Sequence, residues 1–140
     1  MQKNMKRISK YLLALSALTV ITAFSCAAQN VRTVEKDGTV VINTTEIGED
    51  FIGHHAPTPV EIRIVKGKIT DIKALESDET PSYYEKAVTI LKSFIGMTVK
   101  EAKEAKVDAV TGCTMSCNAL IDNVKEGLKY ADGDKIKVLE

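Results

Sequence analysis

The sequence predicts an α+β fold in which an antiparallel sheet, built from hairpins, packs against two or three helices. Two segments each contain a tight-turn signal flanked by strand-forming residues, and in the second segment apolar residues alternate with polar ones. Helical spacing of apolar residues begins only after these segments. A composition of 44% apolar and 27% charged residues is typical of a globular chain. With 140 residues, the chain is long enough for one small domain and too short for a multi-domain enzyme.

Residues 1–25 have the order of a secretory signal, with four basic and no acidic side chains before an apolar run over residues 11–24. This run is too short for a comfortable transmembrane helix. Ala23-Phe24-Ser25-Cys26 resembles the lipobox of bacterial lipoproteins, which implies that Cys26 is acylated and anchors the protein to the lipid bilayer. The alternative is an ordinary signal peptide cleaved near Ala27 or Ala28. Both interpretations place the domain outside the cytoplasm, on the periplasmic face or the cell surface.

The charge balance argues against a nucleic-acid partner. The whole chain has 19 basic and 19 acidic side chains, and removal of the four basic residues of the leader leaves 15 basic and 19 acidic ones, a net charge of −4. A mildly acidic domain has no electrostatic attraction to phosphate backbones.

Two hairpins are expected in the first half of the mature chain. Residues 31–42 form the first, with its turn at Asp37-Gly38. Val60, Ile62 and Ile64 begin the second, whose turn falls at Lys66-Gly67 and whose outgoing strand covers residues 69–75. Residues 53–59, which include two prolines, form an ordered loop between the hairpins.

Helices are expected in the second half. Pro81 can open a helix whose apolar residues, spaced three and four apart, continue to Ile95, and Gly96 can end it. A capping box, Thr98 with Glu101, starts a short helix over residues 98–106 with a solvated, charged face. Residues 107–110 are expected to be extended, residues 116–130 helical, and residues 135–139 a closing strand.

The segment before the last helix is where the sequence indicates chemistry. Thr111-Gly112 leads into the helix, so backbone N–H groups and the positive end of the helix dipole face Thr114. Such a position suits a phosphate, and since residues 107–124 contain no basic side chain, the backbone would have to hold its charge. On spacing alone, a simpler alternative remains: Thr114 or Ser116 is only the N-cap of the helix.

The pattern Asp108-x-x-Thr111-Gly112-x-Thr114 resembles the flavinylation motif of FMN-binding domain proteins. This family includes the C subunit of the sodium-pumping NADH:quinone oxidoreductase and the G subunit of the Rnf complex. The resemblance implies that Thr114 carries FMN through a phosphoester bond, made by a flavin transferase that uses FAD. Cys113 stands where the family usually has alanine.

The resemblance extends beyond this motif. A glycine-containing loop, a hairpin and then Glu79-Thr80-Pro81 follow one another in the order of the family, although Ser82-Tyr83-Tyr84 replaces the glycines often found next. We therefore divide the chain into a signal peptide (1–25), an anchor segment with the first hairpin (26–49) and an FMN-binding domain (50–140). The expected cofactor-binding residues are Thr114, Thr111, Gly112, Cys113, Asp108, Glu79, Thr80, His55 and Tyr83.

Several residues near this site have alternative interpretations. Tyr83 and Tyr84 either contact the flavin or pack on the sheet, and the His54-His55 loop either contacts it or is solvent-exposed. Cys113 and Cys117 form a disulfide, contribute to a metal site, or are buried or flavin-adjacent thiols. Residues four apart on a regular helix lie near the upper end of the Cα range for a disulfide and point in parallel, which favours free thiols.

The resemblance implies an extracytoplasmic electron-transfer flavoprotein with covalent FMN. Its partners would be the flavin transferase and membrane redox proteins or a quinone-linked donor. Because the sequence has no nucleophile–base pair, carboxylate pair or metal-ligand set, no catalytic or metal residue is assigned, and an electron carrier or redox-complex accessory is favoured over a stand-alone enzyme. The alternative is a lipid-anchored binding or structural module that binds FMN noncovalently or not at all.

Overall fold

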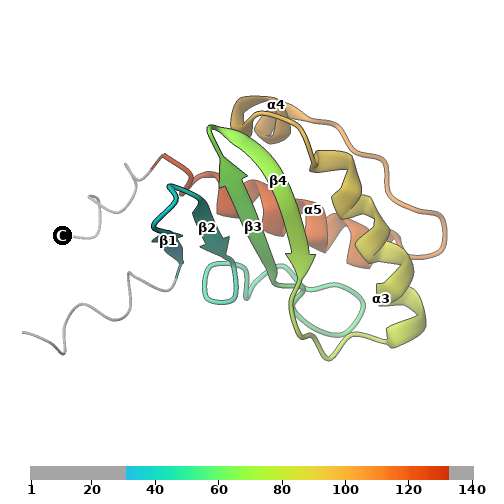
Figure 1. Ribbon diagram of the computed structural model, residues 1–140. Helices are drawn as coiled ribbons and strands as arrows, with labels where there is room; N and C mark the ends of the chain where they lie inside the picture. Colours follow the sequence, from blue (N-terminus) through green and yellow to red (C-terminus); the bar gives the residue numbers. More distant parts are fainter. Residues whose placement is uncertain (1–30, 133–140) are drawn as a thin grey trace, which may run out of the picture.

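A computed structural model of the protein describes residues 31–132. Its strands β1 to β4 form one antiparallel sheet in the order β1-β2-β3-β4, and its helices follow the sheet in the chain (Figure 1). The predicted α+β fold is therefore confirmed. The elements are β1 (Arg32–Val34), β2 (Val40–Asn43), β3 (Val60–Val65), β4 (Lys68–Ala74), α3 (Pro81–Val88), the 3₁₀ helix η1 (Thr89–Phe94), α4 (Val99–Glu104) and α5 (Thr114–Leu128).

Both expected hairpins are present. Gly38, with φ of 88°, allows the turn between β1 and β2, and Lys66 and Gly67, with φ of 51° and 75°, form the turn between β3 and β4. Two successive positive φ angles match the twist of the flanking strands. Along β3, apolar side chains are buried and alternate with half-exposed Glu61 and Arg63, so one face of the sheet is covered and the other meets solvent.

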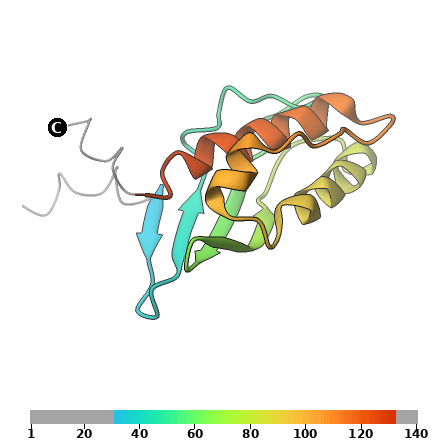
Figure 2. The same ribbon diagram turned by 90° about the horizontal axis from the view of Figure 1, so that it is seen from above.

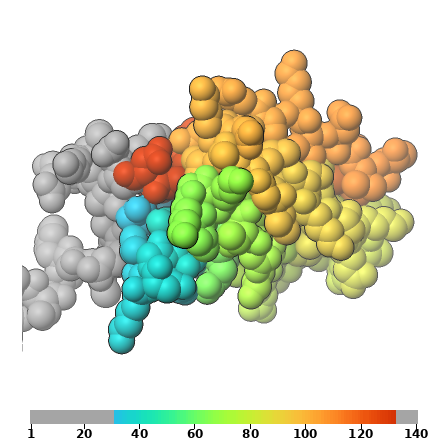
Figure 3. Space-filling view, turned by 45° about the horizontal axis from the view of Figure 1, so that its top comes forward, coloured from blue at the N-terminus to red at the C-terminus, as the bar shows by residue number. Residues whose placement is uncertain are grey.

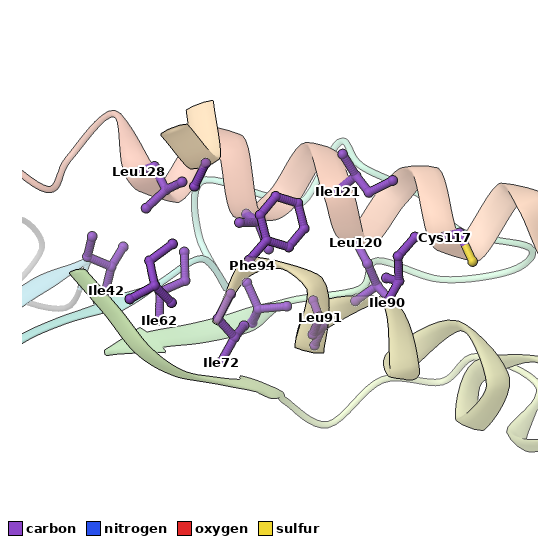
Figure 4. Close-up of a cluster of buried hydrophobic side chains, with 14 of the residues drawn as sticks. Ile42, Ile62, Ile72, Ile90, Leu91, Phe94, Cys117, Leu120, Ile121 and Leu128 are labelled. Atoms are coloured by element: carbon purple, nitrogen blue, oxygen red, sulfur yellow. The ribbon is translucent and has the colours of Figure 1, made fainter. Parts of the chain in front are cut away.

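The helices lie on the covered face of the sheet (Figure 2). α5 packs on β2 and β3, while η1 packs between β4 and α5. Phe94 is fully buried between these layers, in a row of apolar side chains that runs from Leu128 to Cys117 along α5 (Figure 4). A Cβ atom at Gly127 would lie 2.9 Å from Ile62 Cδ1, so glycine permits the close approach of α5 to the sheet.

The helix expected from Pro81 to Ile95 is only partly α-helical. It is α3 up to Val88 and then tightens into η1. At this junction the Thr89 hydroxyl donates a hydrogen bond of 2.6 Å to the carbonyl of Lys86, a contact that competes with the α-helical hydrogen-bond pattern. Ile95 is 43% exposed because the chain has left the helix there, and Gly96 (φ 89°) ends the segment as expected.

The segment before α5 also differs from the prediction. Residues 107–110 belong to no strand, because the N–H of Val110 bonds to Cys117 Sγ and its carbonyl accepts from the N–H of Cys113. α5 begins at Thr114, two residues earlier than expected.

The capping box of α4 and the loop over residues 53–59 are confirmed, and the strand expected over residues 135–139 lies outside the described residues. Within residues 31–132, no helix has the length and apolar character needed to cross a bilayer.

The two ends of the domain are different. β1 lies at one end, and the start of α5 lies at the other, beside α3 (Figure 1). In the space-filling view, the orange segment that precedes α5 lies next to the yellow-green α3 at this end (Figure 3). The segments that carry the predicted chemistry are therefore gathered at the end of the domain away from β1.

Candidate functional site

A pocket of about 320 Å³ lies at the start of α5. Its volume falls within the range of small-molecule sites, about 300–1,000 Å³. The pocket brings together a loop, α3 and the first turn of α5, three segments that are far apart in the sequence. Its lining residues are His54, Tyr83, Gly112, Cys113, Thr114, Met115 and Ser116.

The start of α5 leaves backbone donors available to this pocket. Gly112 adopts φ of 89°, a left-handed conformation that favours glycine, and Cys113 occupies the N-cap position without a side-chain cap. No acceptor for the N–H groups of Thr114, Met115 and Ser116 is found among residues 31–132. Because such N–H groups point toward the helix N-terminus, they suit an anion there. The alternative that Thr114 or Ser116 is merely the N-cap is wrong, since Cys113 holds that position.

Two hydroxyl groups lie on this first turn, and the structure separates them. Ser116 is buried, and its Oγ donates a hydrogen bond of 2.6 Å to Glu79 Oε2. Thr114 is exposed, and its hydroxyl has no hydrogen-bond partner within the described part of the chain. Of these two hydroxyl groups, the one on Thr114 is therefore the one that remains free to react.

Glu79 lies behind the pocket lining and connects two of the segments that form the pocket. It is 4% exposed, and its Oε1 accepts hydrogen bonds from the backbone N–H groups of His55 (2.6 Å) and Ala56 (2.8 Å), while Oε2 accepts from Ser116. Burial would raise the pKa of Glu79, but the hydrogen bonds from Ser116 and from the loop backbone outweigh burial and lower it to about 2. The ionised carboxylate thus ties the loop over residues 53–59 to α5.

Gly53 is required by this arrangement. A Cβ atom at this position would lie 2.8 Å from Oε1 of Glu79, a distance at which the carboxylate would have to move. The loop therefore approaches Glu79 as closely as its backbone allows, and only glycine leaves room for the carboxylate.

Aromatic side chains form the other wall. The rings of His54 and His55 stack with centroids 4.2 Å apart, and the ring of Tyr83 meets His54 edge-on at 5.8 Å. Adjacent residues of a strand point to opposite faces, but these two histidines lie in a loop, where their rings can stack. Tyr84 is partly buried and packs against the apolar core, its hydroxyl donates to the carbonyl of Leu75, and its pKa is raised by burial and by Glu79.

The structure brings four of the expected cofactor-binding residues together in the pocket lining: Tyr83, Gly112, Cys113 and Thr114. Glu79 lies behind them, and His55 contributes its backbone N–H to Glu79. The other expected residues lie outside the lining: Asp108 and Thr111 are exposed, and Thr80 is the N-cap of α3 without a side-chain cap. Cys26 lies outside the described residues.

Sequence reasoning missed three lining residues, His54, Met115 and Ser116. His54 was weighed only as part of its loop. Ser116 contacts Glu79 across a separation of 37 residues, and no sequence pattern connects the two. Met115 follows Thr114 directly. A helix predicted to begin at Thr114 would have placed Met115 in its first turn and so at the site.

Together, the fold and the pocket define a small α+β domain that offers backbone N–H groups and a free hydroxyl to a phosphate-bearing ligand. The family model of the FMN-binding domain matches residues 53–129, which is more than half of the chain. The chain therefore belongs to the FMN-binding domain family, and FMN is the cofactor that this family indicates. No curated protein and no solved structure matches the chain.

The residues of the pocket fit FMN. The first turn of α5 supplies donors for the phosphate, and His54, Tyr83 and Met115 supply aromatic and apolar surface for a flat ring. The match includes the whole pocket but not β1 and β2, although these strands belong to the same sheet.

Proposed function

We propose that this protein is an extracytoplasmic electron-transfer flavoprotein that carries FMN covalently, through a phosphoester bond to Thr114. The observation that carries this proposal is the exposed Thr114 hydroxyl at the first position of α5, on a pocket whose other first-turn hydroxyl, Ser116, is engaged by Glu79. The covalent bond would form at the only one of these two hydroxyls that a transferase can reach.

The composition of the segment that contains Thr114 supports a phosphodiester over a free phosphate. Residues 107–124 contain no lysine or arginine. A phosphodiester has one negative charge, whereas a free monophosphate has nearly two at neutral pH. The N–H groups of the first turn of α5 can hold a single charge, helped by the helix dipole.

The openness of the pocket supports electron transfer. Tyr83 is 44% exposed and Met115 is 60% exposed, so the walls of the pocket reach the surface of the domain. FMN supplies the redox chemistry, and the protein sets its position and surroundings. An isoalloxazine ring between these side chains would keep an edge within reach of a redox partner.

The arrangement of the domain agrees with a lipid anchor at Cys26. β1 begins six residues after Cys26, and six residues span at most about 20 Å. β1 lies at the end of the domain away from the pocket (Figure 1). An anchor at Cys26 would hold the β1 end at the membrane and direct the pocket toward the extracytoplasmic parts of membrane redox proteins or a quinone-linked donor.

The test is the mass of the protein produced with and without a flavin transferase. Trypsin releases residues 107–125 as one peptide, because Lys106 and Lys125 bound a stretch without basic residues. With the transferase, this peptide should gain one FMN less one water in the native protein and in Thr114→Ser, and fragmentation should place the gain on residue 114. Thr114→Ala should gain nothing.

Three outcomes would contradict the proposal. Covalent flavin on the peptide of Thr114→Ala would show that another residue is modified. Flavin that is released by denaturation would show noncovalent binding. An unmodified peptide, with a transferase active on a second substrate, would favour the binding or structural module without covalent flavin.

A further inference from the structure

Two cysteines lie at the pocket, Cys113 in its lining and Cys117 beside Cys113, and the proposed flavin attachment uses neither of them. The thiols of Cys113 and Cys117 are free, and their Sγ atoms are 3.6 Å apart. Both are buried, with Cys113 5% and Cys117 0% exposed, and Cys113 lines the pocket. The pair therefore adjoins both the pocket, which Cys113 lines, and the apolar core, in which Figure 4 labels Cys117.

The geometric argument against a disulfide on a regular helix does not apply to this pair. Cys113 is the N-cap residue, with φ of −138° and ψ of 36°, so its backbone is not helical. Its side chain is consequently free of the parallel orientation that the helix imposes, and the two sulfur atoms meet. Closure to a disulfide of about 2.05 Å requires them to approach by about 1.5 Å.

The backbone of Val110 positions the two sulfur atoms. The backbone of Val110 contacts both: its N–H donates to Cys117 Sγ at 3.4 Å, and its carbonyl accepts from Cys113 Sγ at 3.5 Å. Burial raises the pKa of the Cys113 thiol, as does the adjacent Cys117, so Cys113 is held as a thiol at neutral pH. Within residues 31–132, no group of three or more His, Cys, Asp or Glu side chains could hold a metal ion.

We propose that Cys113 and Cys117 are a reversible dithiol–disulfide site that exchanges two electrons with the FMN of the adjoining pocket. On oxidation, two S–H bonds break and one S–S bond forms. The two electrons and two protons pass to oxidised FMN or, in the absence of flavin, to a small disulfide such as glutathione disulfide, which leaves as two thiols. Only the exchange with FMN rests on the proposed function. The domain would then hold four electrons, two in the flavin and two in the cysteine pair.

The first test measures the cysteine pair independently of the flavin. The full-length protein and Thr114→Ala are equilibrated in buffers of rising glutathione disulfide to glutathione ratio, quenched in acid, unfolded, labelled with N-ethylmaleimide and digested. Peptide 107–125 contains both cysteines, whereas Cys26 lies on another peptide. In both proteins this peptide should change from two labels to none, without a singly labelled form, and should regain both labels after dithiothreitol.

This test separates the failure of the site from the failure of the proposed function. Two labels at every ratio, or a peptide that carries glutathione on one cysteine, would overturn the dithiol site even where FMN is attached to Thr114. Loss of both labels in protein that carries no flavin would support the dithiol site and leave the flavin assignment to its own test.

The second test measures the exchange with FMN. Flavin-loaded, oxidised protein is titrated anaerobically with dithionite, and the equivalents consumed per FMN are compared with those of Cys117→Ala. The native protein should take up twice as many electrons, and Cys113→Ala should behave as Cys117→Ala does if the pair acts as a unit. Equal uptake by the native protein and both variants would overturn the exchange.

Discussion

The two helices α4 and α5 begin in opposite ways. At α4, the Thr98 hydroxyl accepts from the N–H of Glu101, and the Glu101 carboxylate accepts from the N–H of Thr98, so the helix closes its own first turn. At α5, Cys113 provides no side-chain cap. α4 has six residues, of which one is buried, whereas α5 has fifteen residues, of which nine are buried. A helix stabilised by a large buried face can leave its first turn open for a ligand, and a short helix cannot.

The space beside each helix start shows a second difference. The start of α4 adjoins a hollow of about 430 Å³, lined in part by the charged side chains of Lys100, Lys103 and Asp132. The pocket at α5 is smaller, about 320 Å³, and has no lysine, arginine or carboxylate in its lining. Volume alone would select the start of α4. The availability of backbone donors selects α5, because at α4 the N–H groups of Thr98, Val99 and Glu101 already have acceptors.

The largest effect on stability is expected from Glu79, which binds Ser116 in the uncapped first turn of α5. Its pKa is lowered from 4.5 to about 2, so the ionised carboxylate stabilises the folded protein by up to about 3 kcal/mol relative to its protonated form. Because the folded pKa is depressed, this contribution is complete above pH 4.5 and is lost as the pH falls toward 2.

Glu79→Gln should therefore lower the free energy of unfolding at neutral pH and remove the part of its acid dependence between these pH values. Urea denaturation at a series of pH values measures both. Glu76→Gln, in an exposed position three residues earlier, should keep the native pH profile. An unchanged profile in Glu79→Gln would show that the carboxylate is not the group that ties the loop to α5.

The next effect concerns the fit between Gly53 and Glu79. Gly53→Ala places a Cβ atom 2.8 Å from the carboxylate, which must then give up part of its hydrogen bonding. We expect a loss of about 1–3 kcal/mol, the penalty for unpaired buried polar groups. In a Glu79→Ala background the same substitution should have much less effect, and the coupling is measured by a double-mutant cycle. Additive losses would place the strain elsewhere in the loop.

The fold was largely predictable because its signals are local. The hairpin turns at Gly38 and Gly67 and the alternation in β3 depend on neighbouring residues, and all three were expected. The end of α3 was not, since both α and 3₁₀ geometry satisfy the same apolar spacing and the contact of Thr89 with Lys86 decides between them.

The site was predictable only in part because its contacts are not local. The pattern around Thr114 identified the reactive segment, but the contact between Glu79 and Ser116 joins residues 37 positions apart. The start of α5 was placed two residues too late, because its first two residues, Thr114 and Met115, are exposed and lie outside the buried apolar face of the helix. The contact between Cys113 and Cys117 depends on the position of Cys113 as the N-cap of α5. The spacing of residues within a regular helix argued against this contact, because it assumes that both cysteines are helical.

A smaller effect on stability is expected at the capped first turn of α4. Thr98→Ala removes the acceptor of the Glu101 N–H and should lower the free energy of unfolding by about 1 kcal/mol, whereas Thr98→Ser should keep most of it. Flavin attachment and the labelling of peptide 107–125 should not change in either variant. A loss of flavin in folded Thr98→Ala would show that the two helix starts are coupled.

The smallest effect on stability is expected at Thr114 itself. Its hydroxyl has no hydrogen-bond partner among residues 31–132, and the N-cap position belongs to Cys113. In protein without flavin, Thr114→Val, which keeps the β-branched shape and removes only the hydroxyl, should change the free energy of unfolding by less than about 0.5 kcal/mol. Urea denaturation measures this difference. A loss of 1 kcal/mol or more would mean that the hydroxyl caps α5. If stability is unchanged while flavin attachment is abolished, the Thr114 hydroxyl is needed for flavin attachment at the first turn of α5 and contributes nothing to the stability of the fold.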